Sequence, residues 1–199
     1  MIRVLIDNGH GEPPLTGGKE SPDGRLKEYR YCRDIARRVS RELSLRGVDA
    51  MLLTPEPTDV PLRERVRRVN GWARKLGPRN VVLVSIHNNA AASDGKWHSA
   101  SGFSVFVSRN ASENSRRLAR IFTDNADAAG LLGNRCVPPE RYWVQSLAMT
   151  RDTACPAVLT ENLFQDNREE VAFLLSEEGR KAVTDLHVKS IIEYINSMK

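Results

Sequence analysis

Hydrophobic and polar positions alternate along this chain in two different ways. Short apolar or β-branched runs bounded by Gly, Pro, Asn or Asp predict strands, and longer segments with a period of about 3.6 residues predict helices. The predicted strands cover residues 2–7, 49–53, 80–86, 102–108 and 156–160. The predicted helices cover residues 26–46, 62–76, 112–129 and about 177–197.

This alternation of strands and helices favours a parallel sheet, because parallel strands need crossover connections that cover both faces. We therefore predict an α/β fold with a twisted, mostly parallel sheet of about five or six strands, flanked by helices on both faces. Residues 1–199 contain no repeat and no long Pro, Gly or Ser linker, which predicts a single domain.

Local signals refine some of these boundaries. Gly47 follows the first predicted helix and is a candidate for the left-handed residue after its end. Asn110 and Ser112 are candidate N-caps of the third helix. Residues 130–147 lack a clear period and predict a surface loop with a short strand near its end.

The composition is that of a globular protein, with 40% hydrophobic and 28% charged residues among 199. The longest apolar run, near residues 81–84, is far shorter than the roughly 20 residues of a membrane-spanning helix, so we predict no membrane span. Asp7 interrupts the first apolar run too early for a secretory signal. Three cysteines without paired spacing predict reduced thiols, and synthesis in the cytoplasm fits these features best.

The net charge of +5 favours an anionic partner such as nucleic acid, a membrane surface or a cell-wall polymer. Acidic residues are interspersed among the arginines of segments 26–46 and 62–76, the second of which contains Arg65, so we interpret most of this charge as solvated helix faces. The chain has no GxxxxGK[ST] phosphate loop. We therefore predict no nucleotide chemistry and no nucleic-acid partner.

Polar residues follow three of the predicted strands. His10 comes after the first, His87 after residues 80–86, and Glu161 after residues 156–160. If these strands are parallel, all three side chains emerge at the same edge, where ligands bind in open α/β sheets. The alternative interpretation is that each residue only begins a surface loop.

Glu28 is a fourth candidate, because it shares the apolar stripe of the first predicted helix four residues before Cys32. A carboxylate on that stripe is costly to bury without a partner, and a cation would resolve the cost. The alternative is a partly solvated Glu28 in the first turn, favoured by the helix macrodipole.

Two histidines and one carboxylate form the ligand set of a catalytic zinc site, which keeps a fourth position for water. Zinc activates water and polarises a carbonyl, so this set suits hydrolysis. Glu161 is the candidate to take the proton from water and hand it to a leaving amine.

Three other reactive residue types have simpler interpretations. His98 fits an exposed loop histidine, and His187 fits a histidine at the edge of the core. Cys155 fits a small buried hydrophobic residue better than a nucleophile.

Four sequence blocks carry a resemblance to a known family. In order they are Asp7-Asn8-Gly9-His10-Gly11, Glu28, Ser85-Ile86-His87-Asn88-Asn89-Ala90, and Pro156-Ala157-Val158-Leu159-Thr160-Glu161 followed by Asn167. Together, over residues 2–194, they resemble the zinc-dependent N-acetylmuramoyl-L-alanine amidases of the amidase 3 type. Two positions depart from the family, which usually has proline in place of Asn8 and a second glycine in place of Glu12. Neither is a ligand position, so they bear on loop shape and subsite preference.

The resemblance implies one zinc per chain, held by His10, Glu28 and His87, with Glu161 as catalytic carboxylate. The implied substrate is peptidoglycan, cleaved between N-acetylmuramic acid and L-alanine of the stem peptide. It also implies substrate or oxyanion contacts for residues that match the family pattern, Asn88, Asn89 and Arg151.

Further expectations concern regulation and location. The interval between His87 and Glu161 holds a predicted strand, one helix and the 130–147 loop, so we expect an uncovered site and no obligate activator. The chain resembles a phage-type lysis enzyme acting at the bacterial cell wall, and the sequence sets no oligomeric state. Two other functions stay open: a different zinc amidohydrolase or peptidase on this scaffold, and a peptidoglycan-binding module without turnover.

Overall fold

The computed structural model describes residues 2–12 and 19–198. Its described strands form one sheet in the order β2-β1-β3-β6-β4-β5. Strands β2, β1, β3 and β6 are parallel, β4 is antiparallel to β6, and β5 is parallel to β4. The mostly parallel sheet predicted from the sequence is confirmed. The strands are β1 (Arg3–Asn8), β2 (Ala50–Leu52), β3 (Val81–Asn89), β4 (Ser104–Val107), β5 (Trp143–Val144) and β6 (Ala157–Phe164).

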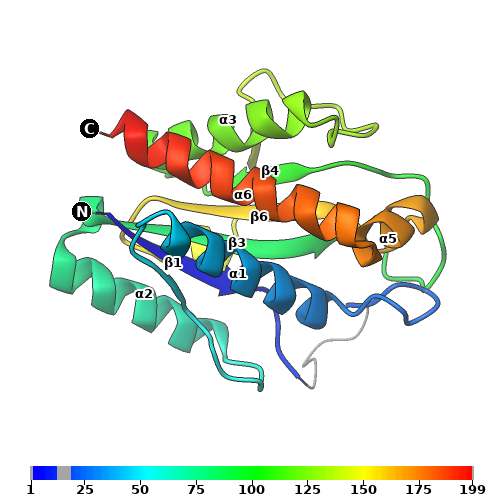
Figure 1. The fold of residues 1–199 in the computed structure, drawn as a ribbon, viewed down its shortest axis with the longest axis horizontal. Coiled ribbons are helices and arrows are strands. Elements are labelled where there is room, and N and C mark those ends of the chain that lie inside the picture. Colours follow the sequence, from blue (N-terminus) through cyan, green and yellow to red (C-terminus); the bar gives the residue numbers. More distant parts are fainter. Residues whose placement is uncertain (1, 13–18, 199) are drawn as a thin grey trace.

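Helices cover both faces of the sheet, as predicted. Figure 1 shows α1, α3 and α6 side by side over one face, where they bury the larger of two apolar clusters. Helices α2 and α4 pack on the other face over a smaller cluster that includes Leu5, Val69 and Met149. The helices are α1 (Glu28–Leu45), α2 (Leu62–Leu76), α3 (Glu113–Ala128), α4 (Ala148–Arg151), α5 (Arg168–Leu175) and α6 (Glu177–Ser197), and a 3₁₀ turn, η1, covers Pro78–Asn80.

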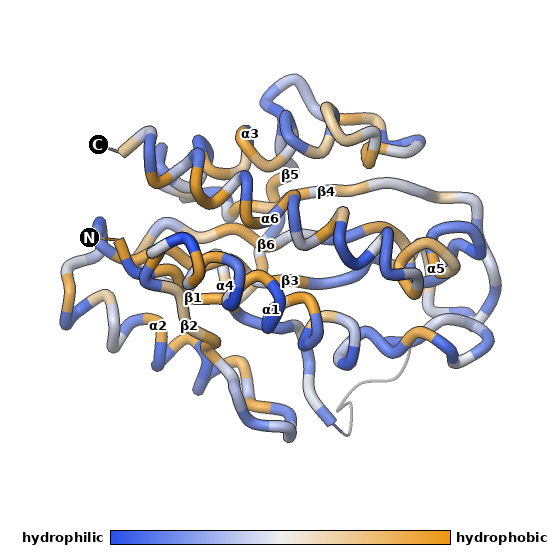
Figure 2. Tube along the Cα trace, in the orientation of Figure 1, coloured by the Kyte–Doolittle hydropathy of each residue, from blue (hydrophilic) through white to orange (hydrophobic). Residues whose placement is uncertain are grey.

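Strand and helix patterning follow from the burial of these faces. In Figure 2 the central strands are largely hydrophobic, whereas the surface helices alternate between hydrophobic and hydrophilic positions. Residues Val4, Ile6, Val82 and Val84 face the larger cluster, and Leu5 and Leu83 face the smaller one. A strand with apolar residues on both sides reads as a continuous apolar run, which is typical of parallel strands. No described helix is long and apolar enough to cross a membrane.

The end of α1 forms as Gly47 predicts. Gly47 has a φ of 74°, its N–H donates to the carbonyl of Ser44, and the N–H of Val48 donates to Leu43. This is the Schellman arrangement, which satisfies carbonyls at a helix end. At the start of α3, Ser112 is the N-cap and accepts from the N–H of Ser115, so of the two candidates Asn110 is not the cap.

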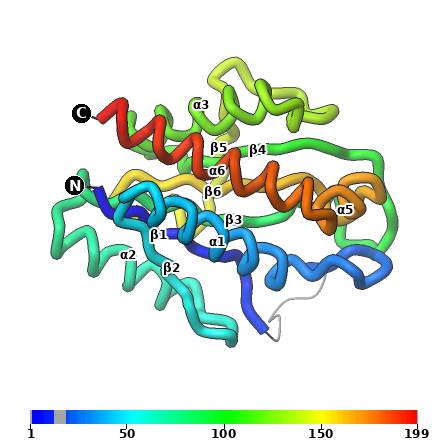
Figure 3. The backbone as a smooth tube through the Cα atoms, viewed as in Figure 1, coloured from blue at the N-terminus to red at the C-terminus, as the bar shows by residue number. Residues whose placement is uncertain are grey.

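Two strand ends differ from the prediction in a way that affects the site. Strand β3 continues to Asn89 and β6 to Phe164, so His87 and Glu161 lie inside strands rather than after them. Helix α5, of eight residues, lies in a segment with no predicted element. The 130–147 segment is mostly loop with β5 near its end, as expected. Figure 3 shows the β3–β4 connection running around the end of the molecule beside α5.

Candidate metal centre

The sheet topology brings the candidate ligands together. Strands β1, β3 and β6 are parallel neighbours, so their carboxyl ends share one edge of the sheet. His10 lies two residues beyond β1, His87 lies near the end of β3, and Glu161 is the register partner of His87 on β6. Glu28 is the first residue of α1 and comes to the same edge from the helix.

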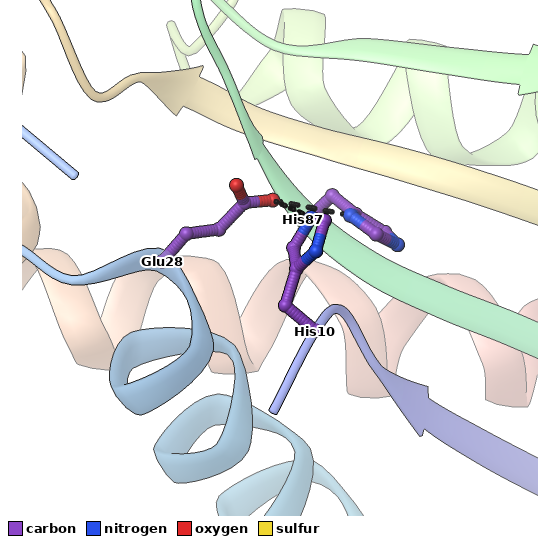
Figure 4. A group of neighbouring side chains, drawn as sticks. All are labelled: His10, Glu28 and His87. Atoms are coloured by element: carbon purple, nitrogen blue, oxygen red, sulfur yellow. Dashed lines mark hydrogen bonds and ion pairs between the residues drawn. The ribbon is translucent and has the colours of Figure 1, made fainter. Parts of the chain in front are cut away.

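His10, Glu28 and His87 converge on one point (Figure 4). Oε1 of Glu28 lies 3.3 Å from Nε2 of His10 and 3.1 Å from Nδ1 of His87. One potential ligand atom from each residue lies within 4.8 Å of the others. Two ligand atoms about 2.0 Å from a tetrahedral zinc are about 3.3 Å apart. The spacing of the three side chains therefore fits a tetrahedral metal ion.

The carboxyl group of Glu28 is buried and only 1% exposed. Burial by itself raises the pKa of a carboxyl, but the hydrogen bonds and charges of His10 and His87 outweigh this effect and hold the pKa of Glu28 below its usual range. Oε1 also accepts from the backbone N–H of Asn88, and Lys19 approaches Oε2 to 4.0 Å. Among the described residues, Oε2 has no hydrogen-bond partner.

A chain of buried polar groups fixes the orientation of the His87 ring. The Ser85 hydroxyl donates to Oδ2 of Asp7 at 2.6 Å, so it accepts from Nε2 of His87 at 3.2 Å. Nε2 of His87 therefore carries a proton, and Nδ1 is the ring nitrogen directed at Glu28. Nδ1 lies 3.1 Å from Oε1 of Glu28. A proton or a metal cation between these two atoms would stabilise this spacing.

Arg65 ties this chain to the loop that carries His10. Its guanidinium donates to Oδ1 of Asp7 at 2.8 Å and to the carbonyls of Asn8 and His10 at 2.5 and 2.9 Å. Arg65 is 2% exposed, so it is an exception to the interpretation of this charge as solvated helix faces. The helical pattern around it is correct, but the loop after β1 packs over its side chain, and no local signal in the sequence shows that contact.

The close approach of β1 and β3 also requires a glycine. A Cβ atom at Gly9 would lie 2.5 Å from two ring atoms of His87. A larger residue at position 9 would displace the ring from Glu28. A cavity of about 210 Å³ opens beside the two histidines and includes the apolar residues Val60, Pro61 and Leu62 in its lining.

Glu161 has surroundings opposite to those of Glu28. Its Oε2 is buried and has no hydrogen-bond partner among the described residues. Burial, and secondly the charge of Glu28, hold the pKa of Glu161 well above its usual range, against the opposing charges of Lys19 and Arg135. A carboxyl group of this kind exchanges protons near neutral pH more readily than an exposed one.

The three predicted substrate contacts have different positions. Asn88 is 3% exposed, and its side chain donates to the carbonyl of Asn162 and contacts Cys32, which favours a positioning role. Asn89 is half-buried at the end of β3, and its Oδ1 accepts from the N–H of Ala90.

Arg151 is not brought together with the other candidates. It pairs with Asp152 and lines a separate cavity of about 630 Å³ with Arg79 and Cys155, beside the amino ends of β3 and β6. Six residues of extended strand separate Val81 from His87, a distance of about 20 Å. This placement does not support Arg151 as a contact to substrate at the metal centre.

The other weighed residues stay outside the site. His98 pairs with Asp94 on the surface. His187 is fully buried in the core, where it contacts Thr160 and Phe122. Burial raises the pKa of Cys155 to about 12, as expected for an inert thiol.

Comparisons with known proteins identify the family of this chain. Residues 4–193 match the family described as N-acetylmuramoyl-L-alanine amidase. The endolysin of Bacillus phage SPP1 is 30% identical over 202 residues, which covers 98% of this chain and 67% of the endolysin.

Two solved structures show the same fold. An N-acetylmuramoyl-L-alanine amidase from Clostridium difficile 630 has a TM-score of 0.83 and 23% identity, covering 100% of this chain and 98% of that one. The catalytic domain of CwlV, an N-acetylmuramoyl-L-alanine amidase from Bacillus (Paenibacillus) polymyxa var. colistinus, has a TM-score of 0.78 and 25% identity, covering 98% and 99%.

Proposed function

The chain belongs to the N-acetylmuramoyl-L-alanine amidase family and hydrolyses the amide bond between N-acetylmuramic acid and L-alanine in peptidoglycan, and we propose that it does so with one zinc ion. The ligands are His10, Glu28 and His87, and Glu161 carries the proton. The observation that supports this proposal most strongly is the convergence of two imidazole nitrogens on one buried carboxylate oxygen. Nε2 of His10 lies 3.3 Å and Nδ1 of His87 lies 3.1 Å from Oε1 of Glu28. These spacings fit ligand atoms around one tetrahedral metal ion.

When bound, zinc supplies a Lewis acid that activates water and polarises the scissile carbonyl. Glu161 takes the proton from the attacking water and passes it to the nitrogen of L-alanine as the amide bond breaks. Its dry surroundings raise its proton affinity, which suits a group that must hold the proton between these two steps. Ser85 and Asp7 keep the His87 ring in the tautomer that leaves Nδ1 free.

Asn89 is the substrate contact that we retain at this edge. Its Oδ1 is engaged with the backbone of Ala90, which leaves the amide N–H groups to donate. They suit the oxygen that gains negative charge when the scissile carbonyl is attacked. Asn88 is a positioning residue and not a substrate contact. Its backbone N–H donates to Glu28, and its side chain donates to the carbonyl of Asn162.

Digestion of purified sacculi tests this proposal. We expect the purified chain to contain one equivalent of zinc, to release stem peptides with a free L-alanine amine, and to lose activity with a chelator until zinc is restored. Cleavage of another amide bond would favour a different amidohydrolase. Binding to sacculi without any product would favour a module that lacks turnover.

We also propose that the chain acts at the bacterial cell wall and needs no activating partner. The side chains of His10 and His87 are 21% and 16% exposed, so substrate has access to the proposed metal position. The measurement is the rate of the isolated chain on sacculi. A chain that stays inert until a second protein is added would contradict this part.

A further inference from the structure

Arg135 lies in the loop after α3 and is held between two aromatic rings. Its guanidinium carbon is 5.0 Å from the ring centre of Trp143 on β5 and 5.4 Å from that of Phe164 at the end of β6. Contacts of this kind hold a planar cation in place at low conformational cost. The backbone at Gly102 packs against the same side chain, because a Cβ there would lie 2.9 Å from Cγ of Arg135.

This cation has no anionic partner in the part of the chain that the structure describes. Arg65, Arg68 and Arg180 each pair with carboxylates. Arg135 makes no ion pair with any residue in 2–12 or 19–198, and its Nε is buried without a hydrogen-bond partner. A fixed guanidinium with unused donors is suited to bind an anion from outside the chain.

The surroundings of Arg135 contain further unpartnered polar atoms. Ser104 is opposite Glu161 in the antiparallel pair of β4 and β6, so both side chains point to the same face of the sheet. Within the described residues, Oγ of Ser104 and Oε2 of Glu161 are both buried without partners. The charge of Arg135 also reaches Glu161, whose proton affinity it opposes.

The strand order shows on which side of the proposed reacting groups Arg135 lies. Across the sheet, β1 and β3 carry His10 and His87, β6 carries Glu161, and β4 and β5 follow. If the scissile carbonyl lies at the histidines and the leaving amine at Glu161, the peptide continues towards β4 and β5. An extended peptide advances about 3.5 Å per residue, so a carboxylate one residue beyond L-alanine lies about 7 Å from the amine. This distance is between one and two strand spacings of about 4.8 Å. Counted from Glu161 on β6, it leads across β4 towards Arg135 beside β5.

We propose that Arg135 is a specificity-determining residue that binds a free carboxylate of the stem peptide on the leaving-amine side. This inference rests on the proposed function and assigns its substrate orientation. Arg135 donates to the carboxylate with the planar fork of its guanidinium, and the rings of Trp143 and Phe164 fix the fork before substrate arrives.

The test compares two N-acetylmuramoyl tripeptides that differ only at the second stem residue, one with a free carboxylate and one with a carboxamide. We expect Arg135→Ala to lower kcat/KM about 10- to 100-fold on the carboxylate substrate and less than about threefold on the carboxamide. Arg135→Lys keeps the charge without the fork and gives an intermediate loss. Arg168→Ala is the matched control, because Arg168 also stacks on an aromatic ring, with its guanidinium carbon 4.6 Å from the ring centre of Trp97. We expect this variant to change kcat/KM on neither substrate.

Zinc content and melting temperature of each variant separate recognition from folding. Equal losses on both substrates, or no loss on the carboxylate substrate, overturn the inference while the amidase proposal stands. If the wild-type chain cleaves neither tripeptide and no peptidoglycan amide, the proposed function fails and this inference fails with it.

Discussion

Glu28 and Glu161 are carboxylates at the same edge of the same sheet, but their environments differ. Glu28 is surrounded by partners: two imidazoles, a backbone N–H and an ammonium group. Oε2 of Glu161 is buried among the described residues without any partner. The pKa of Glu28 is therefore lowered and that of Glu161 raised. Two carboxyls with pKa values driven apart divide into different roles, here ligand and proton carrier.

Replacing Glu161 gives the largest expected effect on activity and tests the two different roles of Glu28 and Glu161. Glu161→Gln keeps the shape but removes the proton acceptor, so the rate on sacculi falls by about 10² to 10⁴ while zinc content is unchanged. The matched variant Glu28→Gln loses zinc together with activity. If Glu161→Gln released zinc and Glu28→Gln kept it, the two roles would be reversed.

His187 provides a test on a buried group outside the site. Burial lowers its pKa from 6.5 to about 4. The unfolded chain binds this proton below about pH 6.5 and the folded chain only near pH 4, so stability falls as pH drops between these values. The loss attributable to this one group is about 3 kcal/mol.

Urea unfolding between pH 7 and pH 4 measures this loss. We expect His187→Gln to have a flatter pH dependence than the wild type, and His98→Gln, at a partly exposed surface site, to retain the wild-type slope. Equal slopes for all three chains would contradict a buried neutral His187.

The groups behind His87 give the next effect in size. Ser85→Ala removes the acceptor of the Nε2–H, so His87 loses its fixed tautomer. Loss of such an outer partner lowers metal affinity by about 10- to 100-fold. Competition with a zinc chelator measures the affinity, and the ¹⁵N shifts of the His87 ring report the tautomer. Ser146→Ala, at an exposed position near Arg151, is the control.

The sequence was sufficient to predict that His10, Glu28 and His87 lie together, but not which groups support them. Period and parallel topology place His10, Glu28 and His87 together, and helices 62–76 and 177–197 have their predicted bounds. Arg65 and Arg135 were missed as site residues because their roles depend on contacts between segments far apart in the chain. A helical pattern cannot tell a buried arginine from a solvated one.

The ends of β3 and β6 were missed for a related reason. The predicted strands include the small polar residues Ser85 and Thr160 but stop before the first strongly polar residues, His87 and Glu161. The strands continue beyond them because backbone pairing between β3 and β6 persists to Asn89 and Phe164.

The smallest expected effect concerns the stability of the metal-free chain. Because the pKa of Glu161 is raised above that in the unfolded chain, this group reduces stability as pH rises above about 4.5. Glu161→Gln removes that cost, so the metal-free variant is more stable than the wild type at pH 7 by roughly 1 kcal/mol, and the difference vanishes near pH 4. Glu140→Gln, at an exposed loop position, leaves the melting temperature unchanged. A metal-free Glu161→Gln chain less stable than the wild type at pH 7 would show that this carboxylate has a partner that holds it, and its assignment as the unpaired member of the two would be wrong.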